Sequence, residues 1–357
     1  MIVNNFFLIA LLIPFTTSSG ITNSSPLLTT WMQTTGTRSP WGGVSYLTDV
    51  TGIWYTTSAV YVLAQGIPSY SIGPWANPNT PSGQNWVYSF PINPSIDNSK
   101  MDLTIYLGQI GAWSNGLPVY GGYDGQTWAN QGVWHRNAYF WEYSSFDACL
   151  GHPDVMGIYH NHVTPICMTK LTNSSIHSPL IGYAFDGYPI YGPYAYQNPL
   201  NASSPIKRMQ SSFSTASYLM NNSIRNTLTN GTVLTSSFYG PNVNSSYPAG
   251  CFLEDWVYNA TTGDLDSCNG RFCITPEYPN GTYAYFTTVD SSFVPYYPFV
   301  IGTCFYGKPT IPNGKSITLP TTNIAKYFSY SNAFIVLNPL NAVFYVIFVW
   351  LSILLSF

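Results

Sequence analysis

The sequence predicts a mainly β protein with antiparallel, sandwich-like sheets, long loops and few short helices, linked by disulfides. Three features of the 357-residue chain predict this class: 17% of the residues are aromatic, only 7% are charged, and 29 Gly and 27 Pro interrupt the chain. Aromatic residues favour strands, and Gly and Pro favour turns. Helical bundles and coiled coils need many charged residues on exposed helix faces. Even in an ordinary soluble domain roughly 25% of the residues are charged. The composition therefore excludes both helical classes.

Charge also limits the partners of the protein. The chain has 11 basic and 14 acidic residues. A nucleic-acid-binding protein needs a concentration of Lys and Arg to neutralise phosphates, and this chain has none. A disordered chain would carry few aromatic residues. Nucleic acid and disorder are therefore both excluded.

Both ends of the chain are apolar. Residues 6–15 form a short apolar block followed by small residues, which is typical of a signal peptide over residues 1–20. Residues 342–357 are apolar to the last position. A GPI-anchor signal over residues 333–357 explains this pattern, and an ordinary membrane helix is the alternative. We therefore expect a protein of the secretory pathway, attached by its C-terminal segment to the membrane at the extracellular face of the cell.

Between these ends we expect one β-rich ectodomain over residues 21–308, followed by a stalk over residues 309–332 that is rich in Ser, Thr and Asn. Short apolar runs bounded by turn signals predict strands. They lie at residues 52–55, 59–63, 86–90 and 102–107. The best helix candidate is the segment 211–225.

Six Cys remain after removal of the signal peptide, and an even number in an oxidising compartment predicts three disulfides. Six Cys allow 15 pairings, and the sequence does not select one. Spacing favours Cys268 to Cys273 and Cys149 to Cys167, which leaves Cys251 to Cys304. Cys167 precedes Met168, so a blue-copper site is an alternative role for this Cys, although a disulfide is favoured.

Asn-x-Ser/Thr triplets are frequent for one chain. In a secreted protein each such triplet marks an exposed loop that accepts a glycan. We expect the protein to be glycosylated at some of the eight sites, which begin at Asn23, Asn173, Asn201, Asn221, Asn230, Asn244, Asn259 and Asn280.

The five His are the strongest candidates for chemistry, because all of them lie between positions 135 and 177. Successive side chains of a strand alternate between its faces, so His160 and His162 should project side by side. Neutral imidazole is a good ligand for copper and zinc. A pair of His on one strand face, with a third from another segment, predicts a transition-metal site.

Several motifs of this region resemble the YHYH-domain family. They are Gly151-His152-Pro153-Asp154, Tyr159-His160-Asn161-His162, the long run 177–193 that contains Asp186-Gly187-Tyr188-Pro189, and segments 265–271, 275–286 and 297–302. The resemblance covers residues 90–307. It implies a secreted or cell-surface protein and carries no established activity.

The chain departs from the family pattern at two places. Asn161 replaces the second Tyr of the eponymous motif, which spares both His, and Tyr283-Ala284-Tyr285-Phe286 stands where many members repeat the motif. A site of four imidazoles from two such motifs is therefore incomplete here. We expect the metal ligands among His160, His162 and His177, with His152, His135 or an Asp such as Asp186 as a further ligand.

Other interpretations fit the same sequence. Asp186 and Gly187 more readily form a tight turn than part of a site. A non-enzymatic adhesion or glycan-binding module is a second function, with Trp113, Trp128 and Trp134 as the rings that would stack on sugars. A third is an extracellular metalloenzyme in which the same His leave one coordination position open. Whether the protein is an enzyme stays open at this level.

Overall fold

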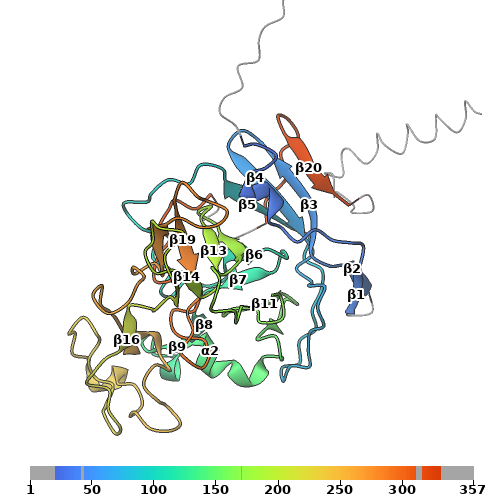
Figure 1. Cartoon of the computed structure of the whole chain (residues 1–357). Coiled ribbons are helices and arrows are strands. Elements are labelled where there is room, and N and C mark those ends of the chain that lie inside the picture. The colour runs from blue at the N-terminus through green and yellow to red at the C-terminus, as the bar shows by residue number, and fades with distance from the viewer. Residues whose placement is uncertain (1–20, 42–43, 170, 311–315, 331–357) are drawn as a thin grey trace, which may run out of the picture.

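A computed structural model of the chain describes residues 21–41, 44–169, 171–310 and 316–330 (Figure 1). The predicted signal peptide and the C-terminal apolar segment lie outside these residues. Among the described residues, no helix has the length and apolarity needed to cross a membrane.

Two sheets form the centre of the fold. The first has the strand order β20 (Ala325–Ser329), β3 (Val50–Tyr55), β4 (Ala59–Ala64) and β5 (Trp86–Pro91), and all its neighbours are antiparallel. The second has the order β18 (Gly270–Cys273), β19 (Thr282–Phe286), β13 (Pro189–Tyr191), β12 (Leu180–Ala184), β6 (Gln109–Trp113) and β7 (Pro118–Tyr120). Its strands are antiparallel except for the pair β13 and β19.

The remaining strands that the structure describes form five two-stranded antiparallel sheets. They are β1 (Arg38–Trp41) with β2 (Val44–Leu47), β8 (Tyr123–Thr127) with β9 (His135–Asn137), β10 (His152–Pro153) with β11 (Tyr159–His160), β14 (Tyr194–Tyr196) with β15 (Ile206–Arg208), and β16 (Phe213–Thr215) with β17 (Trp256–Tyr258). The helices are short: α1 (Pro26–Thr29) and α2 (Ala138–Trp141), with 3₁₀ turns at Trp128–Asn130, Tyr143–Ser145, Ser236–Phe238 and Leu253–Asp255. The predicted mainly β class with antiparallel sheets is confirmed.

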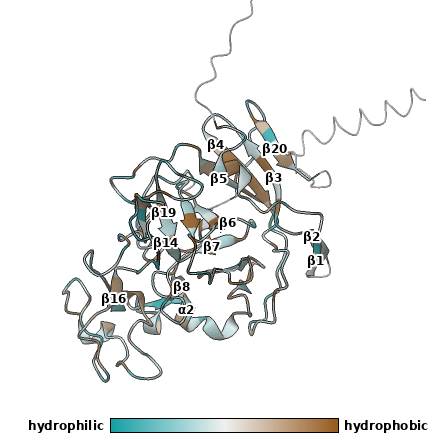
Figure 2. Cartoon of the chain, viewed as in Figure 1, coloured by the Kyte–Doolittle hydropathy of each residue, from teal (hydrophilic) through white to brown (hydrophobic). Residues whose placement is uncertain are grey.

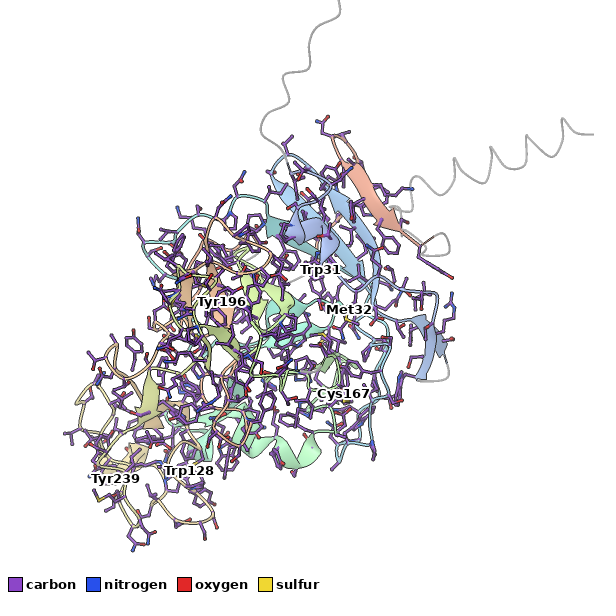
Figure 3. The ribbon with its side chains drawn as sticks, viewed as in Figure 1. Trp31, Met32, Trp128, Cys167, Tyr196 and Tyr239 are labelled. Carbon is purple, nitrogen blue, oxygen red and sulfur yellow. A yellow bond between two sulfur atoms is a disulfide. The ribbon has the colours of Figure 1, made fainter. Side chains whose placement is uncertain are left out.

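The core lies between the two large sheets and is built from aromatic rings. Phe90 of β5 packs against Tyr183 of β12 and against Phe185, with ring centroids 6.0 and 5.8 Å apart. Trp31, labelled near the centre of Figure 3, contacts both Phe90 and Tyr183. Apolar residues of β3 and β4 show as brown segments in Figure 2, where these strands cover the same core. Burial of aromatic area on both inner faces is what makes the arrangement sandwich-like.

The turn between β12 and β13 confirms the structural interpretation of Asp186-Gly187. Oδ1 of Asp186 accepts a hydrogen bond from the backbone N–H of Tyr188, and Gly187 has φ of +89°. A Cβ at this glycine would lie 2.7 Å from Cγ of Pro91, so a side chain there would collide with the first sheet. The motif is therefore a turn that connects two core strands.

Two secondary-structure predictions were wrong. Residues 102–107 form a turn, since the carboxylate of Asp102 accepts a hydrogen bond from the N–H of Thr104. In the predicted helix 211–225 the structure instead has strand β16 followed by turns. Ser223 is the clearest reason: its hydroxyl accepts from the N–H of Met220 and donates to the carbonyl of Tyr218, and such side-chain bonds compete with helix formation.

The segment predicted as a stalk contributes to the first sheet. Strand β20 lies within it and pairs with β3, and the N–H of Ile317 donates to the carbonyl of Val87 in β5. The described part of the segment therefore forms one edge of this sheet, at β20, and also hydrogen-bonds to β5 at the opposite edge. In Figure 1 this strand appears in red beside β3.

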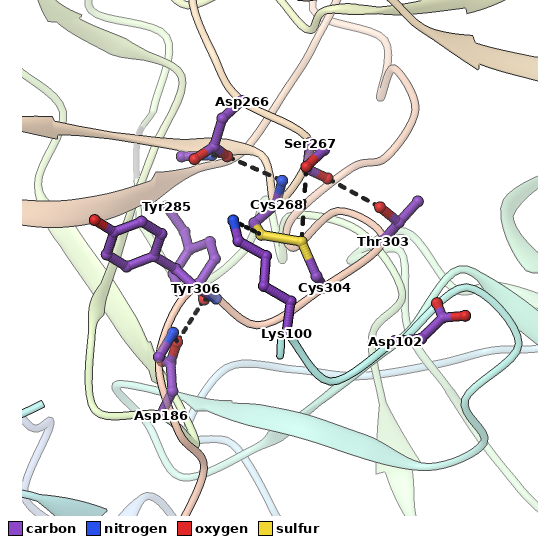
Figure 4. Close-up of a disulfide and its surroundings, with 12 residues drawn as sticks. Lys100, Asp102, Asp186, Asp266, Ser267, Cys268, Tyr285, Thr303, Cys304 and Tyr306 are labelled. Carbon is purple, nitrogen blue, oxygen red and sulfur yellow. Dashed lines mark hydrogen bonds between the residues drawn. A yellow bond between two sulfur atoms is a disulfide. The ribbon is translucent and has the colours of Figure 1, made fainter. Parts of the chain in front are cut away.

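Two disulfides connect the loops. The predicted pair Cys149 and Cys167 is confirmed, but Cys268 pairs with Cys304 (Figure 4). The predicted Cys268 to Cys273 bond was wrong because strand β18 is extended between them, and an extended strand advances roughly 3.3 Å per residue. Cys251 and Cys273 are buried free thiols, so the predicted Cys251 to Cys304 bond was wrong as well. Cys251 packs in a separate cluster with Trp134 and Phe252, whereas Cys304 belongs to the main core.

Candidate metal centre

A short hairpin places the first two His opposite each other. In the antiparallel pair β10 and β11, His152 is the direct partner of His160. The carboxylate of Asp154 closes the intervening turn by accepting hydrogen bonds from the N–H groups of Met156 and Ile158. Directly opposite side chains of an antiparallel pair project from the same face, so the two imidazoles meet.

His162, two positions after His160 in the chain, brings a third imidazole to the same place. Nε2 of His160 lies 3.2 Å from Nε2 of His152 and 3.2 Å from Nε2 of His162. The N–H of Tyr120 donates to the carbonyl of Asn161, which attaches this segment to β7 at the edge of the second sheet. The side-by-side placement of His160 and His162 predicted from the sequence is therefore present in the structure. We call His152, His160 and His162 the His triad.

The hydrogen bonds of the three rings assign their protons. Nδ1 of His160 donates to the carbonyl of Ile158 at 3.0 Å, and Nδ1 of His162 donates to the carbonyl of Gly121 at 2.5 Å. Nδ1 of His152 lies 2.6 Å from the hydroxyl of Ser145, which itself donates to a backbone carbonyl and so accepts from the ring. In the neutral form of each ring the proton is therefore on Nδ1. All three Nε2 lone pairs face one another.

The His triad is buried and packs against aromatic rings. The exposed fractions of His152, His160 and His162 are 5%, 3% and 3%. The ring of Tyr120 stacks on His160 at 4.0 Å between centroids, and Phe146 contacts His152 edge-on at 4.8 Å. Burial, together with the neighbouring imidazoles, lowers the pKa of His152 and of His160 to about 3. Both rings therefore stay neutral well below pH 7, as metal ligation requires.

Glu142, which directly follows α2, is a charged neighbour of the His triad that the sequence did not single out. Its Oε2 lies 3.0 Å from Nε2 of His162 and 3.6 Å from Nε2 of His152. Burial opposes charge on His162, but the hydrogen bond and charge of Glu142 outweigh it and raise the pKa of His162 above its usual value. The sequence offered one signal, since Glu142 is one of only three Glu in the chain and precedes His152 by ten residues.

A dense polar network holds the hairpin that carries the His triad. Asp147 accepts hydrogen bonds from the N–H groups of Cys149 and Gly151 and from the hydroxyl of Tyr159. A Cβ on Gly151 would lie 2.4 Å from the Tyr159 hydroxyl, so only glycine allows this approach. The disulfide of Cys149 closes the same loop, and a disulfide leaves no thiolate for the blue-copper alternative at Cys167.

The other predicted ligands lie outside the His triad. His135 pairs through Nδ1 with the carboxylate of Glu254. His177 donates from Nδ1 to the carbonyl of Ser178 and packs against aromatic rings. Asp186 accepts a hydrogen bond from the hydroxyl of Tyr285, so it lies in the core and not at the His triad. Among the described residues, the group whose nitrogens lie within 4.8 Å of one another consists of His152, His160 and His162.

His177 makes the stability of the domain sensitive to acid. Burial lowers its pKa from 6.5 to about 4, so the ring is neutral in the folded state while the unfolded chain binds a proton below pH 6.5. Its stabilising contribution is therefore complete above pH 6.5 and is lost as the pH falls towards 4. At about 1.4 kcal/mol per pKa unit, the loss is about 3 kcal/mol.

Urea unfolding at pH 7 and at pH 4.5, in the presence of a chelator, checks this expectation in the native chain and in His177→Gln. The acid-induced loss of unfolding free energy should be smaller in the variant by roughly 2 to 3 kcal/mol. Equal losses in the two proteins would contradict it. The contributions of His152 and His160 are common to both and cancel in the difference.

The predicted glycosylation sites and the Trp proposed to stack on sugars differ in how exposed their side chains are. All eight Asn of the predicted glycosylation sites are exposed. Of the three Trp proposed to stack on sugars, Trp113 and Trp134 are completely buried, and Trp128 is half-buried against Tyr247. Trp128 lies at the lower left of the molecule in Figure 3, near the label of Tyr239. The core interpretation of these Trp is therefore the one that the structure supports.

Comparison with known protein families shows which family the chain belongs to. Residues 87–299, more than half of the chain and including the whole His triad, match the family model described as YHYH protein. No curated protein and no solved structure gives a significant match. The resemblance stated from the sequence motifs is thus confirmed, and the chain belongs to the YHYH protein family.

Proposed function

We propose that this protein binds a divalent transition metal, zinc or copper, through Nε2 of His152, His160 and His162. The observation that carries the proposal is the orientation of the rings: each Nδ1 is used in a hydrogen bond to an acceptor, and the three Nε2 atoms are left facing one another. Metal-ligating His commonly use the second ring nitrogen in this way.

The distances support a cation between the rings. Lone pairs 3.2 Å apart repel, and a single proton shared between two of these nitrogens would bridge only one of the two contacts. A metal at the centre bonds all three nitrogens. Zinc-to-nitrogen bonds of 2.0–2.1 Å in a tetrahedral site place ligand atoms roughly 3.3–3.4 Å apart, close to the separations of His160 from its two neighbours.

The setting we propose is a secreted or surface-anchored glycoprotein. Two disulfides between loops support an oxidising compartment, where such bonds persist. The exposure of all eight glycosylation-site Asn supports their use. The apolar residues at both ends of the sequence support export and attachment to a membrane, by a GPI anchor or a membrane helix.

Metal analysis of the purified full-length chain tests the proposal. After incubation with zinc or with Cu²⁺ and removal of the excess, we expect one tightly bound ion per chain in the native protein and none in the variant His152→Ala/His160→Ala/His162→Ala. The matched control is His135→Ala/His177→Ala, which removes His outside the His triad and should keep the full stoichiometry. A triple variant that binds as much metal as the native chain, or a native chain that binds none, would refute the proposed function.

A further inference from the structure

The carboxylate of Glu142 lies beside two of the three nitrogens of the His triad. Its Oε2 is 3.0 Å from Nε2 of His162 and 3.6 Å from Nε2 of His152. A tetrahedral zinc site with bonds of 2.0–2.2 Å has ligand atoms roughly 3.3–3.6 Å apart. These two separations are close to those of a tetrahedral site. Among the described residues, the group whose ligand atoms all lie within 4.8 Å of one another holds only the three His, so Glu142 would shift towards His160 to complete the site.

The same oxygen lacks any other partner. Oε2 of Glu142 is buried and accepts no hydrogen bond from a neutral donor among the described residues. Its ion pairs there are with His152 and His162 only, because the nearby guanidinium of Arg136 pairs with Asp124. A buried carboxylate oxygen whose only partners are imidazoles costs free energy unless one of them is protonated, and a metal ion bound between the carboxylate and the His triad removes this cost.

The backbone holds Glu142 in this position. Asn137 caps the start of α2 by accepting from the N–H of Tyr139, and the N–H of Ala138 donates to the carbonyl of Gly122. The indole N–H of Trp141 donates to the carbonyl of Cys251. The helix is therefore fixed at both ends before any ion binds, so Glu142 needs little rearrangement to act as a ligand.

From this geometry we propose that Glu142 is the fourth ligand and completes a three-His, one-carboxylate site for Zn²⁺. This inference rests on the proposed metal-binding function and narrows it. Three neutral imidazoles leave the charge of a buried dication uncompensated. One carboxylate ligand reduces the net charge of the site from +2 to +1. An oxygen ligand also disfavours Cu⁺, which prefers sulfur, so the set selects a divalent ion such as zinc.

The test compares zinc affinity and cobalt spectra in three full-length proteins: the native chain, Glu142→Gln and the matched control Glu254→Gln. Glu254 is also a half-buried Glu paired with a His, His135, but lies outside the His triad. Zinc affinity is measured by competition with a chromophoric chelator. The visible absorption of bound Co²⁺, which is intense for four-coordinate and weak for six-coordinate ions, reports the coordination number.

We expect Glu142→Gln to lose more than 100-fold in zinc affinity, beyond the roughly 10–100-fold that loss of an outer partner of a ligand costs, and to show a weaker cobalt spectrum. Glu254→Gln should match the native chain in zinc affinity and in its cobalt spectrum. A loss of 100-fold or less with an unchanged cobalt spectrum would overturn the role of Glu142 and leave the His triad as the metal site. A native chain that binds neither ion would overturn both proposals, so the two failures are distinguishable.

Discussion

Zinc should raise the free energy of unfolding of the purified chain by about 4 kcal/mol when free zinc exceeds its dissociation constant a thousandfold. The stabilisation arises because the nitrogens of the His triad converge only in the folded state, so the ion binds the folded chain in preference to the unfolded one. Urea unfolding with zinc, and again with a chelator, measures the difference. In His160→Asn, which removes the central ring of the His triad, the gain should disappear.

The control for this prediction is His135→Gln, which changes a His whose partner is Glu254 and leaves the His triad intact. This variant should show the full gain in stability with zinc. An equal gain in His160→Asn would mean that the ion binds elsewhere and would contradict the assignment. A general effect of zinc on the unfolded chain would appear as the same shift in all three proteins.

Breaking the buried ion pair of Arg225 and Asp255 should destabilise the domain by about 3–5 kcal/mol. Both side chains are fully buried, and the guanidinium donates from Nε and Nη2 to the two carboxylate oxygens, each at 2.8 Å. Arg225 also donates to three backbone carbonyls, of Pro241, Tyr247 and Pro248. In Asp255→Ala the guanidinium would remain buried without its counter-charge, and this cost is the source of the effect. Urea unfolding measures it.

An ion pair of equal length provides the comparison. Lys207 and Asp264 are also 2.8 Å apart, but their side chains are 35% and 19% exposed. Lys207→Met should therefore cost less than about 1 kcal/mol, because water screens the pair. The double variant Arg225→Met/Asp255→Leu, which removes both buried charges, should be far more stable than Asp255→Ala. Similar losses for Asp255→Ala and Lys207→Met would contradict the role of burial.

This ion pair also bears on the metal centre through α2. Asp255 accepts hydrogen bonds from the N–H groups of Gly250 and Phe252, and the carbonyl of Cys251 between them binds Trp141 of α2. The loop 250–255 thus supports the helix that directly precedes Glu142. The loop continues into β17, which pairs with β16. In Figure 1, β16 lies at the lower left of the molecule, near α2. Loss of the ion pair should therefore weaken metal binding as well as stability.

The sequence sufficed for the features that depend on local pattern. Aromatic and β-branched runs predicted β3, β4 and β5, because strand propensity and alternation act over a few residues. It failed at residues 102–107 and 211–225, where the side chains of Asp102 and Ser223 bond to nearby backbone groups and end regular structure. Composition did not predict β20, whose pairing with β3 joins segments more than 250 residues apart in the chain.

At the candidate site, too, some features follow from the local sequence and others from the tertiary structure. The spacing of two positions predicted that His160 and His162 lie side by side, as they do even though β11 ends at His160, and all eight Asn of the glycosylation motifs are exposed. Only the tertiary structure decided that His152 and Glu142 join them, that His135, His177 and Asp186 do not, and that Cys268 pairs with Cys304. The physical reason is that these contacts depend on strand register and on where long loops return, and each is decided by packing between segments distant in sequence.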